Sequence, residues 1–246
     1  MNLGDMAQIM NIIVNKLCNN IKFWNSADSI LEQTLEVFVD LVTSYGSSKT
    51  LLSLETVNFL VLNHVGAHFP FLGFDNENKY RITFYAALSR LVFSSAEDLN
   101  NSFDAYIEPN LSILRHLTQT ADLRDRGVRI ALIGCLRDLR GIASATHNKR
   151  TYNLFFDALY PEFFPLFKRV ADTWYDDHNV MTALLKFMQV ISFFVKIIRL
   201  SLLFRNSFSI KVNASLLNNQ VLTVFSYSAR LVPYFALMEV VYYPSR

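Results

Sequence analysis

Amphipathic segments with helical periodicity recur along this 246-residue chain, and their recurrence constrains the fold more than any other feature. One of them begins after Ser26, a suitable N-cap, and stops at Gly46. Its apolar residues follow the i, i+4, i+7 spacing that places side chains on one face of an α-helix. These residues are Leu31, Leu35, Phe38, Val42 and Tyr45. The pattern predicts one helix between Ser26 and Gly46.

Further segments of this kind begin roughly every 20–27 residues. They predict helices at 5–24, 50–65, 77–94, 103–120, 123–146, 151–174 with a break near Pro161 and Pro165, and 179 to about 204. Paired, such helices approach the length of HEAT or armadillo repeats. Hairpin-rich β folds are disfavoured because only 7 Gly and 6 Pro are available for tight turns. The sequence therefore predicts an all-α helical-repeat fold.

The segment 122–147 has the clearest helical pattern. At about 100° per residue, five apolar side chains fall within an arc of about 80°. They are Val128, Leu132, Cys135, Leu139 and Ile142. Gly127, Gly134 and Gly141 recur every seven residues on a flank of the helix, and this spacing predicts close packing by a second helix.

Four arginines lie on the arc opposite the apolar one: Arg126, Arg129, Arg137 and Arg140. We interpret them as a candidate partner-binding stripe, with ion pairs inside the protein or simple solvation as the alternative. A helical-repeat nucleic-acid binder would also use such a stripe. No exposed aromatic residues are interleaved with these arginines, as they typically are in single-strand binders, so nucleic acid is not the expected partner.

Four blocks of sequence carry a family resemblance. In chain order they are Leu54–Gly73, Arg81–Leu91, Arg137–Ala143 and Tyr152–Asp176. Over about Met10 to Met188, the chain resembles the exportin-7 branch of the importin-β (karyopherin) superfamily of nuclear transport receptors. The resemblance implies a right-handed HEAT/armadillo-type α-solenoid of about four helix pairs, spanning residues 1–188. It also implies an internal fragment of a longer receptor, without the family's Ran-binding N-terminal repeats.

The same resemblance implies nucleocytoplasmic protein transport as the function. The implied partners are cargo proteins, Ran-GTP in the context of the full receptor, and the Phe-Gly repeats of nucleoporins. The implied location is nucleus and cytoplasm and the nuclear pore complex. A truncated, transport-incompetent product that keeps only a protein-binding scaffold is the alternative. Neither reading requires catalysis, and no membrane is expected among the partners.

Charge is unevenly distributed, although the net charge is only +2. Residues 1–114 carry 12 acidic and 6 basic side chains, whereas residues 115–150 carry 8 basic and 3 acidic ones. Acidic surfaces suit basic partners and basic surfaces suit acidic ones. A solvated solenoid surface is the alternative explanation of both.

Candidate chemical sites are few. His64 and His68 have the i, i+4 spacing of a metal-binding helix, but without the zincin glutamate or a third ligand a core or capping role is favoured. Asp176 and Asp177 follow an expected helix end and are interpreted as capping residues. With no phosphate-loop, dinucleotide or nucleophile motif present, we expect no enzyme, no cofactor and no metal.

Residues 189–246 form a divergent hydrophobic tail of uncertain structure. The run 221–243 is long enough to raise the question of a membrane span, but Arg230, Pro233 and Glu239 interrupt it. A buried or aggregation-prone helix is the favoured interpretation.

Overall fold

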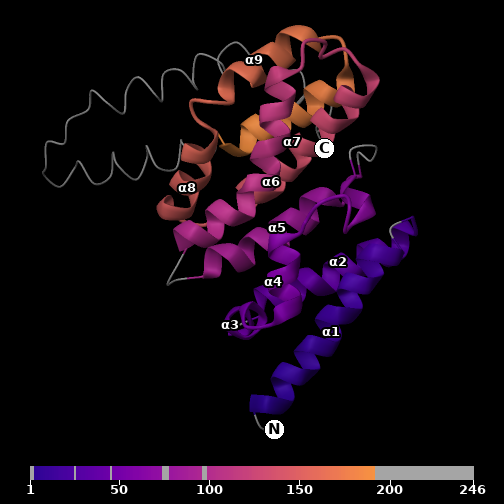
Figure 1. Cartoon of the computed structure of the whole chain (residues 1–246), viewed down its shortest axis with the longest axis vertical. Coiled ribbons are helices and arrows are strands. Elements are labelled where there is room, and N and C mark those ends of the chain that lie inside the picture. The colour runs from indigo at the N-terminus through magenta and orange to yellow at the C-terminus, as the bar shows by residue number, and fades with distance from the viewer. Residues whose placement is uncertain (1–2, 25, 45, 74–77, 96–98, 192–246) are drawn as a thin grey trace, which may run out of the picture. The chain divides into compact units, whose positions relative to one another are not determined.

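The computed structural model describes residues 3–24, 26–44, 46–73, 78–95 and 99–191 (Figure 1). The chain divides into two compact units, Met1–Phe187 and Met188–Arg246. Residues 188–191 are helical and the rest of the second unit lies outside the described residues. The predicted helix beyond residue 191 and the hydrophobic run 221–243 fall there. We refer to the described part of the first unit, residues 3–187, as the repeat body.

The repeat body is built from helices, and no strand occurs among its described residues. In chain order its elements are α1 (Leu3–Phe23), α2 (Asp28–Thr43), α3 (Ser47–Leu52), α4 (Glu55–Leu62), the 3₁₀ turn η1 (Pro70–Leu72), α5 (Arg81–Ser94), α6 (Leu99–Gln119), α7 (Arg126–Ala145), α8 (Lys149–Leu159) and α9 (Phe164–Thr173). Residues 178–187 form a further helix. No helix in this described part is long and apolar enough to cross a bilayer.

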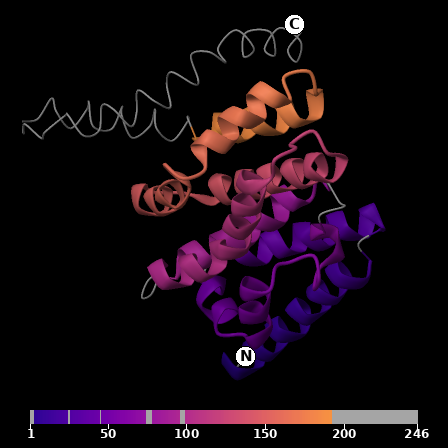
Figure 2. The same cartoon turned by 45° about the horizontal axis from the view of Figure 1, so that its top comes forward.

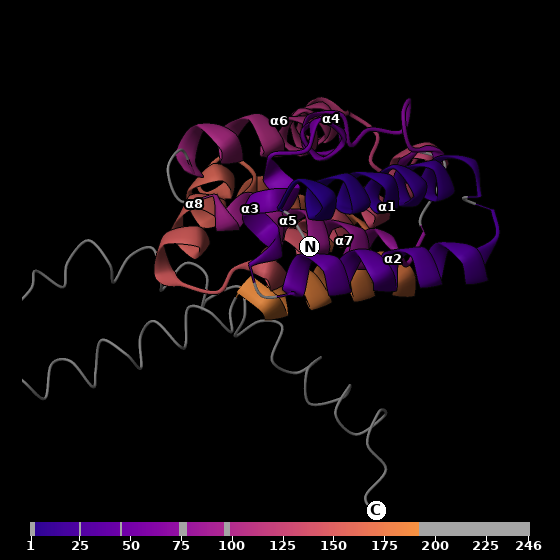
Figure 3. The same cartoon turned by 90° about the horizontal axis from the view of Figure 1, so that it is seen from below.

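These helices stack in two layers. In one layer α2 packs on α5 and α5 packs on α7, while in the other α1, α4, α6 and α8 follow one another. Contacts of α1 with α2, of α5 with α6 and of α6 with α7 join the layers. Figures 2 and 3 show this order in the repeat body, with α4 and α6 on one side and α2 on the other.

The arrangement gives four helix pairs in the described residues. They are α1 with α2, α3 and α4 with α5, α6 with α7, and α8 and α9 with the helix at 178–187. In the last pair the Phe167 ring of α9 meets the Phe187 ring edge to face, with centroids 5.4 Å apart. The fold is an all-α helical-repeat solenoid, as the periodicity predicts.

Local sequence explains where several helices begin. Asp125 precedes α7, and its carboxylate accepts hydrogen bonds from the backbone N–H groups of Gly127 and Val128. Asn148 and Thr151 form a reciprocal capping box before α8. A proline stands in the first turn of α9, where its missing N–H costs nothing. The predicted break between α8 and α9 is confirmed.

Two predicted helices differ from the structure. The single helix expected at 50–65 is two short helices, α3 and α4, separated at Ser53 and Leu54. Helical apolar spacing continues from Leu51 across Ser53 to Leu54 and does not reveal such a break. Ser26 is not the N-cap of α2: that position is Ala27, which makes no side-chain capping bond.

The glycine flank of α7 packs against α5, and these two helices share the most extensive contact among the helices of the repeat body. A Cβ atom at Gly141 would lie 2.6 Å from the Ile82 carbonyl oxygen and 2.8 Å from the Tyr85 Cβ. At Gly134 it would lie 3.3 Å from the Arg81 guanidinium carbon. Close packing is therefore confirmed at these two positions. It is wrong for Gly127, whose only near neighbour is the capping carboxylate of Asp125.

Candidate protein-binding surfaces

The four arginines of the candidate stripe occupy different environments. Arg126 is exposed at the first turn of α7, whereas Arg129, Arg137 and Arg140 are each partly buried. Burial lowers the pKa of Arg140. Ile133 falls in the same arc of the helix and has no exposed surface. The sequence predicts that α7 buries its apolar arc and exposes its arginine arc. This is wrong for the middle of α7, where Ile133 in the arginine arc is buried as well as the apolar arc.

Arg129 makes an ion pair inside the repeat body. Its Nε lies 2.7 Å from one oxygen of Asp177 and its Nη2 lies 3.3 Å from the other. Asp177 also accepts hydrogen bonds from the backbone N–H groups of Asn179 and Val180, and so caps the helix at 178–187. The Arg129 guanidinium and these N–H groups hold the Asp177 pKa below its usual range, although partial burial opposes them. The predicted capping role of Asp177 is confirmed.

Asp176 has a different role from the predicted cap. Its carboxylate receives two hydrogen bonds from the Arg124 guanidinium, at 2.8 and 3.0 Å, in an exposed ion pair. The same guanidinium lies over the Trp174 ring, with its carbon 5.1 Å from the centroid. Together with the Arg129 pair, this contact joins the start of α7 to the turn at 174–177.

Another ion pair lies in the core and has no counterpart among the sequence-based predictions. Arg81 at the start of α5 donates from Nε and Nη2 to the two carboxylate oxygens of Asp138 on α7, and both side chains are at most 5% exposed. Burial raises the Asp138 pKa to about 6, with the Arg81 charge opposing this shift. Burial alone would lower the Arg81 pKa, but the Asp138 carboxylate outweighs it and the net shift is upward. The pair is thus ionised at pH 7.

His64 is a core residue. Its Nδ1 lies 3.1 Å from the Tyr85 hydroxyl and its Nε2 lies 2.9 Å from the Tyr106 carbonyl oxygen. Burial lowers the His64 pKa to about 4, so the ring is neutral at pH 7. His68 instead meets the Phe59 ring edge to face. The predicted core role is confirmed for His64, and no group of three metal-ligating side chains occurs among the described residues.

The exposed side of α2 carries an acidic groove. Glu32, Glu36 and Asp40 are exposed at successive i, i+4 positions. They line a shallow cavity of about 460 Å³ together with Leu35, Val39, Tyr80 and Thr83. The Tyr80 hydroxyl donates a hydrogen bond to Glu32 at 3.0 Å and ties the end of the groove to the start of α5. This surface matches the excess of acidic residues in the first part of the sequence.

Comparison with known proteins identifies the family. A family described as "Exportin-7-like, TPR domain" matches residues 1–80. Exportin-7-B of Xenopus laevis is 31% identical over 194 residues, which are 76% of this chain and 18% of that protein. The chain is an exportin-7 relative.

Other exportin-7 relatives show the same extent of similarity. Ran-binding protein 17 of Homo sapiens is 32% identical over 193 residues, or 76% of this chain and 18% of that protein. Ran-binding protein 16 of Drosophila melanogaster is 30% identical over 194 residues, or 75% of this chain and 18% of that protein. The chain thus spans about a fifth of the length of these exportin-7 proteins. No solved structure matches it.

Proposed function

We propose that this chain serves as a helical-repeat segment of a nuclear transport receptor, which binds cargo proteins and Ran-GTP when it stands in the full receptor. The observation that carries the proposal is the similarity to exportin-7 and Ran-binding proteins over about three quarters of the chain. Each is a protein whose name states export or Ran binding. The proposed role is binding and release without catalysis, in nucleus and cytoplasm and at the nuclear pore complex.

The acidic groove on α2 is the proposed contact for a basic surface of cargo or Ran. Three exposed carboxylates at one helix face create a negative potential that favours a basic partner. The arginines of α7 are the second proposed contact, led by Arg126, which is exposed. Arg129 is the weakest member of this set because Asp177 already occupies its guanidinium. Phe-Gly nucleoporins remain a proposed partner, with no groove assigned to them.

A chimeric receptor tests the proposal. Residues 1–187 replace the matching segment of a full-length exportin-7 relative, and Ran-GTP-dependent cargo binding is measured by pull-down. We expect the chimera to bind cargo with Ran locked in its GTP state and not with Ran-GDP. A chimera that folds, as shown by circular dichroism and a single cooperative melt, but binds no cargo would contradict the proposal.

Charge reversal then tests the groove within the working chimera. Glu32→Lys, Glu36→Lys and Asp40→Lys together should weaken binding of a basic partner and reduce its salt dependence, because attractive charge is removed. Asp104→Lys on the exposed side of α6 is the matched control. Equal binding by the triple variant and the control would show that the groove is not the contact.

A further inference from the structure

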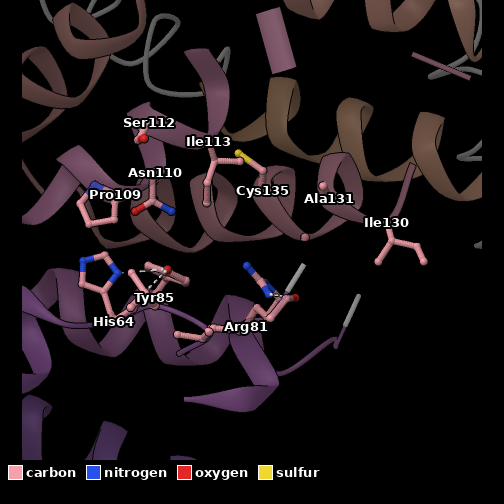
Figure 4. A pocket seen from close by; sticks show the side chains of 15 residues that line it. His64, Arg81, Tyr85, Pro109, Asn110, Ser112, Ile113, Ile130, Ala131 and Cys135 are labelled. Carbon is pink, nitrogen blue, oxygen red and sulfur yellow. Dashed lines mark hydrogen bonds between the residues drawn. The ribbon is translucent and has the colours of Figure 1, made fainter. Parts of the chain in front are cut away.

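Tyr175 is the most exposed tyrosine in the described part of the chain. It stands in the turn between α9 and the helix at 178–187, and it is 70% exposed. The other described tyrosines are buried or partly buried; Tyr85, for example, lies in the core beside His64 (Figure 4). Aromatic rings stabilise proteins mainly through the surface that they bury, and the Tyr175 ring buries little. Its hydroxyl is therefore available to a molecule from outside.

The neighbours of Tyr175 in the turn are each engaged with the repeat body. Trp174 is buried, with the Arg124 guanidinium over its ring. Asp176 accepts two hydrogen bonds from the same guanidinium, and Asp177 caps the next helix. The turn itself is closed by a hydrogen bond from the Asp177 N–H to the Trp174 carbonyl, at 2.9 Å. The fold thus holds the turn at the surface, outside any helix, and leaves the Tyr175 side chain unused.

The charges around Tyr175 are of two kinds. Asp172, Asp176 and Asp177 stand within three residues of it, so the surrounding sequence is acidic and suits an enzyme with a basic substrate groove. The cation Arg124 lies on the other side of the turn. Its hydrogen bonds to Asp176 raise the Arg124 pKa most, and negative charge on the Tyr175 oxygen raises it further. A negative charge added at Tyr175 would therefore be stabilised by this guanidinium.

We propose that Tyr175 is a phosphorylation site and that Arg124 binds the phosphate. A tyrosine kinase transfers the γ-phosphoryl group of a nucleoside triphosphate to the phenol oxygen. The bond between the γ-phosphorus and the β,γ-bridging oxygen breaks, and a bond from that phosphorus to the phenol oxygen forms. The phenol proton passes to a base of the kinase, and the nucleoside diphosphate leaves. The product carries a charge of about −1.5 to −2 at pH 7 and three acceptor oxygens.

The modification changes one contact between successive repeats and preserves another. The pair of Arg124 with Asp176 and the pair of Arg129 with Asp177 both join the start of α7 to the turn. A phosphate competes with the Asp176 carboxylate for Arg124, because it offers more charge and more acceptors to the planar guanidinium. Arg124 then moves to the phosphate and Asp176 is released. The partly buried pair of Arg129 and Asp177 stays in place, so the next helix keeps its cap.

Treatment of the folded full chain with a purified tyrosine kinase that has a basic substrate groove, and with magnesium ATP, tests the site. Mass spectrometry locates the phosphate. We expect modification of Tyr175 at a rate at least about tenfold above that of Tyr152, which is 5% exposed and needs local opening to react. Tyr175→Phe should remove this phosphate, and Tyr152→Phe should leave it unchanged.

The unfolded peptide 169–181 gives the rate of the same kinase without the fold. A kinase that modifies the peptide but not Tyr175 in the chain would overturn the proposal, and so would a kinase that fails on the peptide. Equal rates at Tyr175 and Tyr152 would also overturn it, since they would mean that the kinase acts on opened chains.

The phosphorus resonance of the modified chain tests the role of Arg124. The second pKa of the phosphate is read from its chemical shift as the pH is varied. A nearby guanidinium favours the dianion and lowers this pKa, so the pKa should be about 0.5 higher in modified Arg124→Gln. Arg150→Gln, at an exposed arginine of α8, is the matched control and should leave it unchanged. Equal values in the modified wild type and in Arg124→Gln would overturn the assignment of Arg124.

Discussion

Arg81 and Asp138 are 57 residues apart in sequence and form a buried, two-contact ion pair between α5 and α7, with Nε and Nη2 at 2.7 and 2.5 Å from the carboxylate oxygens. The two helices belong to successive repeats. The pair thus joins one repeat to the next at the same place where Gly134 allows the guanidinium to approach α7.

Removing one partner of this pair should destabilise the repeat body strongly. Asp138→Leu leaves the Arg81 charge buried and uncompensated, which typically costs about 3–5 kcal/mol. The double variant Arg81→Met with Asp138→Leu should recover much of that loss, because no buried charge remains. Urea unfolding of the single and double variants measures both effects. A double variant no more stable than Asp138→Leu would contradict this account.

Gly141→Ala should destabilise although alanine is the better helix former. The new Cβ would meet the Ile82 carbonyl at 2.6 Å, so α5 and α7 must move apart. We expect a loss of about 1–3 kcal/mol, typical of overpacking. Gly127→Ala is the matched control, near the exposed start of the same helix, and should change stability by less than about 1 kcal/mol. Thermal and urea melts with the same outcome for both glycines would be inconsistent with close packing at Gly141.

The arginines of α7 should differ in their effect on stability. Arg129→Ala removes the ion pair with the Asp177 carboxylate that also caps the next helix, and should cost about 1 kcal/mol. Arg126→Ala removes an exposed side chain and should be near neutral within about 0.5 kcal/mol. Denaturant midpoints of the two variants test the ranking. The reverse order would mean that the Arg129 pair does not form in solution.

Stability should fall as the pH drops from about 6.5 to about 4 because of His64. The unfolded chain binds a proton on this ring below its usual pKa of 6.5, whereas the folded protein resists protonation until about pH 4. The contribution present above pH 6.5 is on the order of 3 kcal/mol and is lost across that window. Asp138 contributes the reverse effect on stability in part of this range. Its pKa in the folded protein is raised to about 6, so its protonation as the pH falls stabilises the folded state.

The comparison of the wild type with His64→Gln isolates the histidine. Asp138 titrates in both proteins, so the difference in unfolding free energy between them reports His64 alone. We expect the wild type to lose more stability than His64→Gln between pH 6.5 and pH 4. Parallel pH profiles for the two proteins would show that the ring is protonated in the folded state as readily as in the unfolded chain.

Several features of the fold could be predicted because they depend on neighbours in sequence. Apolar spacing placed α2 and α7 within a few residues of their observed bounds. The prolines placed the break between α8 and α9. Capping by Asp177 follows from its place just before a helix. The break between α3 and α4 could not be predicted, because apolar residues continue at helical spacing on both sides of Ser53 and no proline or glycine marks it.

The candidate sites were harder to predict because their partners are distant in sequence. Asp138 stands between arginines in a helical pattern, which suggests a solvated position, yet it is buried against Arg81. Asn110 has apolar neighbours at i±3 and i±4, which indicates a buried position, but the sequence does not show which residues its amide meets. An aspartate or asparagine at a helical position whose neighbours at i±3 and i±4 are apolar is the pattern that can reveal such residues.

The sequence by itself determined the helical class, the repeat organisation and the exportin-7 kinship, because these rest on local periodicity and on residue order. The tertiary structure alone decided which charges are used and which are free to bind. Arg129 meets Asp177 across 48 residues and Arg81 meets Asp138 across 57. Such pairs depend on how far one helix pair rotates against the next, and that rotation is set by side-chain packing summed over the whole interface rather than by any single segment.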